Sequence, residues 1–121
     1  MPVKNILVVD DSPTERVFTV DVLTKAGYQV TTAENGEEGI AKAKASKPDL
    51  ILMDVVMPGL NGYQATRTLT RDDETKNIPI IVCTTKWQET DKIWGLRQGA
   101  VDYLVKPPNP EQLLQRIAAL P

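Results

Sequence analysis

Five short apolar segments alternate with segments of helical pattern along this 121-residue chain. Apolar runs of this length that are rich in Val and Ile are too short for helices, and they predict strands. Strands that alternate with helices indicate βαβ units in a parallel sheet covered on both faces. We therefore expect one α/β domain over residues 1–121, a doubly wound (βα)5 parallel sheet. The expected strands cover residues 5–10, 28–33, 49–54, 80–84 and 101–105.

Start and stop signals place the helices between these strands. Ser12 is a suitable N-cap with Pro13 at the first helical position, and Gly27 ends the same segment. Within it, Phe18, Val22 and Ala26 recur at the four-residue spacing of one helix face. Further helices are expected between a turn at Asn35-Gly36 and a break at Lys47-Pro48, with Ile40 and Ala43 inward, over about 63–71, over about 88–98, and over 110–120 with Leu113, Ile117 and Leu120 on one side.

Composition excludes several classes of function. The net charge of −2 gives no bulk electrostatic reason to bind DNA or an anionic membrane. No apolar run approaches the roughly 20 residues of a membrane helix, and the N-terminus lacks a signal-peptide pattern. Cys83 is the only cysteine, so it is expected to be an inert buried thiol in a reducing compartment. The absence of histidine removes His-based catalysis and His metal ligands. We expect a cytoplasmic protein that neither binds DNA nor inserts into a membrane.

Charged side chains stand where three of the expected strands end. Asp10 and Asp11 follow the first strand, Asp54 ends the third, and Lys106 follows the fifth. The carboxyl ends of parallel strands meet at one edge of the sheet, where ligands bind in open α/β folds. Asp10 and Asp11 by themselves would also fit a solvated strand end that caps the next helix. Together with Asp54 and Lys106, they predict a site for a hard cation and a phosphate.

Magnesium suits this set of oxygen ligands, because it prefers oxygens in octahedral geometry and retains several waters. Asp11 and Asp54 can each give one carboxylate oxygen, and the backbone carbonyl of Val56 can give a third. Asp10 can orient a bound water or the other carboxylates. Without a metal the three carboxylates would repel one another, and some of their pKa values would rise.

A carboxylate beside Mg²⁺ can also attack phosphorus and form an aspartyl phosphate. Asp54 is the best candidate nucleophile, because it stands alone at the end of a central strand. Lys106 supplies an ammonium that can stabilise charge on the transferring oxygens. Thr84, at the end of the fourth expected strand, can donate a hydroxyl hydrogen bond to a phosphoryl oxygen, or it can bond to the backbone instead.

In order along the whole chain, these residues resemble a response-regulator receiver domain, the CheY-like fold. The stretches 54–67 and 84–92 further resemble stand-alone regulators of type IV pilus twitching motility, the PilH type. The matching elements are Asp10-Asp11, Asp54, Met57-Pro58-Gly59, Asn61-Gly62, Thr84, Gly99-Ala100, and Tyr103 three residues before Lys106-Pro107.

The resemblance implies the flavodoxin-like strand order 2-1-3-4-5. It implies that a histidine kinase of a chemosensory or two-component system phosphorylates Asp54, with Mg²⁺ as cofactor. Thr84 and Lys106 would then contact the phosphoryl group, and Tyr103 would move inward as Thr84 shifts. The face formed by the fourth helix, fifth strand and fifth helix would change shape toward a downstream protein target. The implied metal ligands are Asp10, Asp11, Asp54 and the carbonyl of Val56.

Several alternatives remain open at this stage. The protein either carries a signal to a partner or draws phosphoryl groups away from a sister regulator. A Mg²⁺-dependent phosphohydrolase would need an acid/base two residues after the nucleophile, where this chain has the apolar Val56, so we do not expect an enzyme. A metal-independent interaction module is a third possibility. Trp87 and Trp94 either cap the edge of the core or form a partner-docking patch.

Overall fold

A computed structural model describes residues 3–55, 59–84, 93, 96–106 and 109–120 of the chain. Its five strands form one parallel sheet in the order β2-β1-β3-β4-β5. This confirms the α/β class and the strand order 2-1-3-4-5. The bounds are β1 Asn5–Val9, α1 Pro13–Lys25, β2 Gln29–Ala33, α2 Gly36–Ser46, β3 Leu50–Asp54, α3 Gly62–Arg71, β4 Ile80–Thr84, β5 Asp102–Val105 and α5 Pro110–Ala118.

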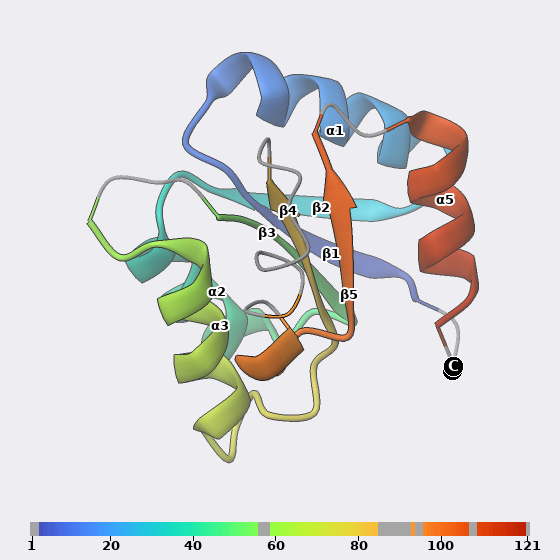
Figure 1. Cartoon of the computed structure of the whole chain (residues 1–121). Helices are drawn as coiled ribbons and strands as arrows, with labels where there is room; N and C mark the ends of the chain where they lie inside the picture. The colour runs from blue at the N-terminus through green and yellow to red at the C-terminus, as the bar shows by residue number, and fades with distance from the viewer. Residues whose placement is uncertain (1–2, 56–58, 85–92, 94–95, 107–108, 121) are drawn as a thin grey trace.

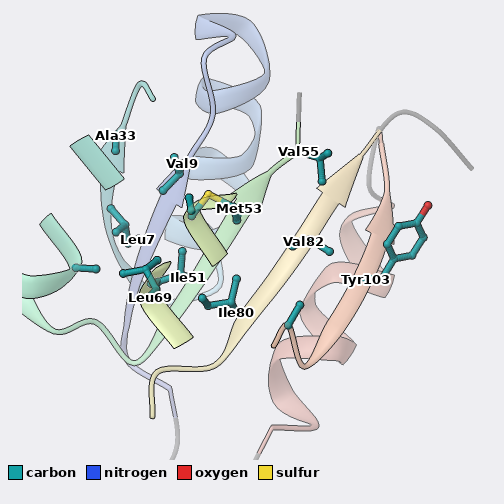
Figure 2. Packing of buried hydrophobic residues seen from close by; sticks show 13 residues of the cluster. Leu7, Val9, Ala33, Ile51, Met53, Val55, Leu69, Ile80, Val82 and Tyr103 are labelled. Atoms are coloured by element: carbon teal, nitrogen blue, oxygen red, sulfur yellow. The ribbon is translucent and has the colours of Figure 1, made fainter. Parts of the chain in front are cut away.

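Helices cover both faces of the sheet (Figure 1). Helices α1 and α5 lie on one face, and α2 and α3 lie on the other. The apolar side chains of β1, β3 and β4 alternate between two hydrophobic clusters, as the pleat requires. Figure 2 shows the cluster on the α2 and α3 side, which includes Leu7 of β1, Met53 of β3 and Leu69 of α3. The opposite cluster includes Ile6 of β1 and Leu113 of α5. Burial on both faces explains why the central strands are almost wholly apolar.

Local capping chemistry sets the helix boundaries, and the predicted cap at Ser12 is confirmed. The Ser12 hydroxyl accepts a hydrogen bond from the backbone N–H of Glu15, and Pro13 is the first residue of α1. Asn109 caps α5 in the same way, with Pro110 at its first position. Lys47 ends α2 in the left-handed region at φ 47°. The ends of these helices are therefore set largely by local sequence.

Within α1, Leu23 is fully buried and Val22 packs partly buried against the hydrophobic cluster on that side of the sheet, whereas Phe18 and Ala26 are exposed. Two sequence predictions need correction. Asn35-Gly36 is not a separate turn, because Asn35 is the N-cap of α2 and Gly36 its first residue. The last helix ends at Ala118 rather than Leu120.

Most of the helix predicted over about 88–98 lies outside the described residues, as do Trp87 and Trp94. Within the described ranges, no helix combines the length and the apolar character needed to cross a membrane.

Candidate functional site

The sheet register brings the predicted site residues to one edge. Val9 pairs with Met53, so Asp10 and Asp54, the next residues along β1 and β3, lie near each other. On the other side of β3, Asp54 pairs with Cys83 of β4. Thr84 at the end of β4 pairs with Val105, the residue before Lys106. Strand ends from four distant parts of the sequence therefore meet at the carboxyl edge of the sheet.

Lys106 lies at the centre of this edge and pairs with three carboxylates. Its Nζ is 2.6 Å from Asp10 Oδ2, 2.8 Å from Glu15 Oε2 and 3.1 Å from Asp54 Oδ1. The side chains of Lys106, Asp10 and Asp54 are each at most 7% exposed, whereas Glu15 is 44% exposed. Three of the four charges are thus buried, and Glu15 reaches the cluster from its solvent side.

The carboxylate of Asp10 is held through both of its oxygens. Oδ1 accepts a hydrogen bond of 2.9 Å from the backbone N–H of Ser12, and Oδ2 accepts the one from Lys106. Its backbone carbonyl accepts a hydrogen bond of 2.7 Å from the guanidinium of Arg16. Asp10 is therefore fixed in orientation by the start of α1, which suits the orienting role predicted for it.

The conformation at Asp54 depends on the first residue of α3. The backbone N–H of Gly62 donates to the carbonyl of Val55 at 3.0 Å. A Cβ atom on Gly62 would lie 2.1 Å from the carbonyl oxygen of Asp54, so no other residue fits there without displacing the backbone. Asn61 caps α3 through a capping box with Gln64, which fixes where the helix begins. The Asn-Gly pair is thus a helix start packed directly behind the strand end that carries Asp54.

Burial dominates the protonation of Asp54. Burial raises the pKa of this carboxyl to about 6. The Lys106 ammonium lowers this pKa, and the nearby charges of Asp10 and Asp11 raise it further. Burial opposes the charge on Lys106 too, yet hydrogen bonds to Asp10 and Glu15 hold the pKa of this ammonium above its usual range. Because one ammonium faces three carboxylates, the site would gain from a further positive charge.

A small cavity of about 20 Å³ lies beneath the cluster. Asp10, Asp54, Cys83 and Lys106 contribute to its lining, and its volume is sufficient for about one water molecule. Burial raises the pKa of the Cys83 thiol to about 12, so Cys83 is the inert buried thiol that the sequence predicts.

The structure brings together Asp10, Asp54 and Lys106. The other predicted site residues do not join this cluster or are not fully described. Asp11 is exposed and is not among the described carboxylates that converge on the site, although its charge still acts on Asp54. Tyr103 is 8% exposed and lies on β5 at the edge of the cluster in Figure 2. Thr84 is placed only by its backbone at the end of β4. Val56 lies outside the described residues.

The sequence reasoning missed Glu15. Carboxylate oxygens of Asp10, Glu15 and Asp54 lie within 4.8 Å of one another, a spacing that a single metal ion can bridge. Glu15 is the third residue of α1. An acidic side chain in the first turn of a helix is usually explained by its favourable interaction with the helix dipole, so it does not by itself indicate a site. Its position could have indicated that it reaches the site, because it lies in the first turn of a helix that begins directly after Asp10 and Asp11.

Replacing Lys106 with Met is expected to destabilise the metal-free protein by about 2–4 kcal/mol at pH 8, because buried carboxylates then lack their cation. At pH 5 the loss should be smaller, since the pKa of Asp54 is about 6 with Lys106 present and rises further without it, so Asp54 is protonated at pH 5 and no longer needs the ammonium. Urea unfolding with a chelator at both pH values measures this difference.

Lys76→Met is the matched control for this experiment. Lys76 pairs with Asp73 at 3.2 Å on the surface, where the two side chains are 50% and 94% exposed. Such a pair contributes at most about 1 kcal/mol, so this variant should stay near wild type at both pH values. An equal loss for Lys106→Met at pH 5 and pH 8 would contradict the electrostatic explanation.

Comparison with known proteins identifies a matching family and several related proteins. The model of the response regulator receiver domain family matches residues 6–118. The chain is 61% identical over 115 residues to protein PilH of Pseudomonas aeruginosa, which covers 95% of each chain. It also matches PhoB of P. aeruginosa at 44% identity, where it spans about half (51%) of that protein's length.

Solved structures agree with these relatives. The chemotaxis protein CheY4 of Vibrio cholerae superimposes with a TM-score of 0.89 at 37% identity, over 95% of this chain and 96% of that one. The receiver domain of the sensor histidine kinase PA1611 of P. aeruginosa has a TM-score of 0.87 at 32% identity, over 94% and 93% of the two chains. That structure holds a magnesium ion coordinated in its active-site cleft.

Proposed function

The chain belongs to the response regulator receiver domain family, and from this premise we propose that residues 1–121 form a stand-alone response regulator phosphorylated on Asp54. The observation that carries the proposal is the buried pairing of Asp54 Oδ1 with Lys106 Nζ at 3.1 Å, beside the fixed carboxylate of Asp10. A nucleophile, an ammonium and an orienting acid are the groups that phosphoryl transfer to a carboxylate requires.

Magnesium fits the charges and the donor atoms of this site. Oxygens of Asp10 and Asp54 lie within 4.8 Å of each other, and burial raises the pKa of Asp54, against the lowering effect of Lys106 and with a further rise from the charges of Asp10 and Asp11. We propose that Asp10, Asp11, Asp54 and the Val56 carbonyl hold the ion, directly or through water. When bound, Mg²⁺ would offset the carboxylate charges and stabilise charge on the transferring phosphoryl oxygens.

The proposed reaction is transfer from a phosphohistidine of a kinase. A carboxylate oxygen of Asp54 forms a bond to phosphorus as the bond between phosphorus and the histidine nitrogen breaks, and the electron pair of that bond returns to the imidazole. Lys106 would contact an oxygen of the transferred group, and Thr84 would donate its hydroxyl to another. Asp10 accepts hydrogen bonds from the Ser12 N–H at the start of α1 and from Lys106, and it thereby holds the ammonium beside Asp54.

We propose that the phosphoryl group changes the face formed by β5, α5 and the helix predicted over about 88–98. The added charge and acceptor oxygens at the end of β3, next to the end of β4, would bias two arrangements of Thr84 and Tyr103. A downstream protein would read that face. The 61% identity to PilH supports a role in type IV pilus twitching motility, with a histidine kinase of a chemosensory system as the phosphoryl donor in the cytoplasm.

A phosphorylation assay on the wild-type protein tests this function. The protein is incubated with acetyl phosphate, or with a phosphorylated histidine kinase, in the presence of Mg²⁺ or of a chelator. We expect intact-protein mass spectrometry to show one added phosphoryl group that requires Mg²⁺, and borohydride trapping followed by peptide mapping to locate it on Asp54. Absence of the added mass with every donor, or a label on another residue, would refute the proposal.

A further inference from the structure

Glu15 contributes a carboxylate to the site, although it is not among the predicted metal ligands. It reaches Lys106 from the first turn of α1, and its Oε2 accepts a hydrogen bond of 2.8 Å from Nζ. This distance is shorter than the 3.1 Å between Nζ and Asp54 Oδ1. Lys106 is therefore held at least as closely by Glu15 as by the proposed phosphorylation site.

The ammonium of Lys106 has three N–H donors. In the described part of the chain, three carboxylates lie within 3.1 Å of Nζ, those of Asp10, Glu15 and Asp54. A phosphoryl oxygen on Asp54 needs one of these donors for itself. The existing contacts compete with that oxygen for the donors, and of the two carboxylates other than Asp54 itself, Asp10 and Glu15, the structure indicates which one gives way more easily.

Asp10 is poorly suited to release the ammonium. Its side chain is 5% exposed, and its other oxygen is tied to the Ser12 N–H, so it cannot turn toward water. Glu15 is 44% exposed, and water can replace the hydrogen bond that it loses. The charge of Glu15 would also repel a phosphoryl group that approaches Lys106, while it would attract a divalent cation.

We propose that Glu15 is a positioning residue that holds Lys106 in the unphosphorylated protein and releases it when Asp54 carries a phosphoryl group. The proposal depends on the function proposed above. It means that Glu15 lowers the affinity of the site for a phosphoryl-like anion and raises its affinity for Mg²⁺. The effects on anion and cation have opposite signs, which a general loosening of the site would not produce.

Glu15→Gln tests the proposal, because it keeps the shape of the side chain and removes its charge. The probes are Mg²⁺ alone and then beryllofluoride, an acyl-phosphate mimic, at saturating Mg²⁺. We expect calorimetry to show Mg²⁺ binding about 2–5-fold weaker and beryllofluoride binding about 3–10-fold tighter than in the wild type, magnitudes typical of one partly exposed charge near the site. Fluorine NMR of the bound beryllofluoride gives an independent measure of the second affinity.

Glu111→Gln is the matched control, since Glu111 lies in the first turn of α5 and its side chain is exposed. It should leave both affinities unchanged. Beryllofluoride affinity in Glu15→Gln that equals or falls below that of the wild type would overturn the role of Glu15 while leaving the proposed function intact. A wild-type protein that binds neither probe would overturn the proposed function and this inference with it.

Discussion

Asp54→Asn is expected to abolish phosphorylation completely and, in the metal-free protein at pH 8, to increase the free energy of unfolding. Asparagine offers no carboxylate oxygen for the bond to phosphorus, so no label should form with any donor. The gain in stability follows from burial, which raises the pKa of Asp54 to about 6 in the folded protein. A neutral amide in the same place avoids the cost of burying that charge.

The sign of the pH dependence follows from the direction of this shift. A carboxyl whose folded pKa lies above its unfolded value of 3.8 stabilises the fold fully below that value, and this contribution is lost as the pH rises through about 6. Asn does not titrate, so the gain in unfolding free energy of Asp54→Asn over the wild type should develop between pH 4 and 7 and remain at higher pH. With solvent screening allowed for, we expect a gain of about 1–2 kcal/mol at pH 8 and little at pH 4.

Urea unfolding in chelator at pH 4 and pH 8, with intact mass after phosphorylation, measures both effects. Asp49→Asn is the control with the opposite sign, because backbone N–H groups of Asn5 and Lys4 lower the pKa of Asp49. That variant should lose stability at pH 8 relative to pH 4. A stability gain for Asp54→Asn that is equal at both pH values, or a residual label, would contradict the assignment.

Gly62→Ala is expected to produce the largest loss of stability, on the order of 4 kcal/mol or more. The added Cβ would lie 2.1 Å from the carbonyl oxygen of Asp54 and 2.7 Å from the Cα of Val55. Both atoms belong to the backbone, so neither can move aside by a change of rotamer. The start of α3 or the end of β3 must shift, and a shift of β3 would displace Asp54 from Lys106.

Thermal and urea unfolding of Gly62→Ala should be compared with Gly27→Ala. Gly27 has a positive φ of 99° but nothing within 4 Å of an added Cβ, so its substitution tests backbone strain without a clash. Strain of this kind costs about 1–2 kcal/mol. If Gly62→Ala loses no more stability than Gly27→Ala, the close packing of α3 against β3 does not have the importance that we assign to it.

Local patterns were sufficient for much of the fold. The capping roles of Ser12 and Pro13 depend only on neighbours in sequence, and they are confirmed. The direction in which α1 faces was not predictable from its spacing. Phe18 is 43% exposed although it is among the largest apolar residues of the helix, because the position of α1 over the sheet places Leu23 inward instead.

The site shows the same division between local and tertiary information. The positions of Asp10, Asp54 and Lys106 at strand ends were readable from sequence, because parallel strands all present their carboxyl ends at one edge. That rule does not say how far each side chain is turned toward its neighbours. Asp11 is adjacent to Asp10 in the chain, yet it is exposed while Asp10 is 3% exposed.

The sequence by itself determined the alternation of strands and helices, the strand ends that carry charge, and the start of α1 at Ser12 and Pro13. These features depend on interactions within a few residues of the chain. Only the tertiary structure decided that Glu15 holds Lys106, and that the backbone of Gly62 packs against Asp54. The first contact joins residues 91 positions apart, and the second leaves no room for a Cβ atom, so both depend on how each helix packs against the sheet rather than on local pattern.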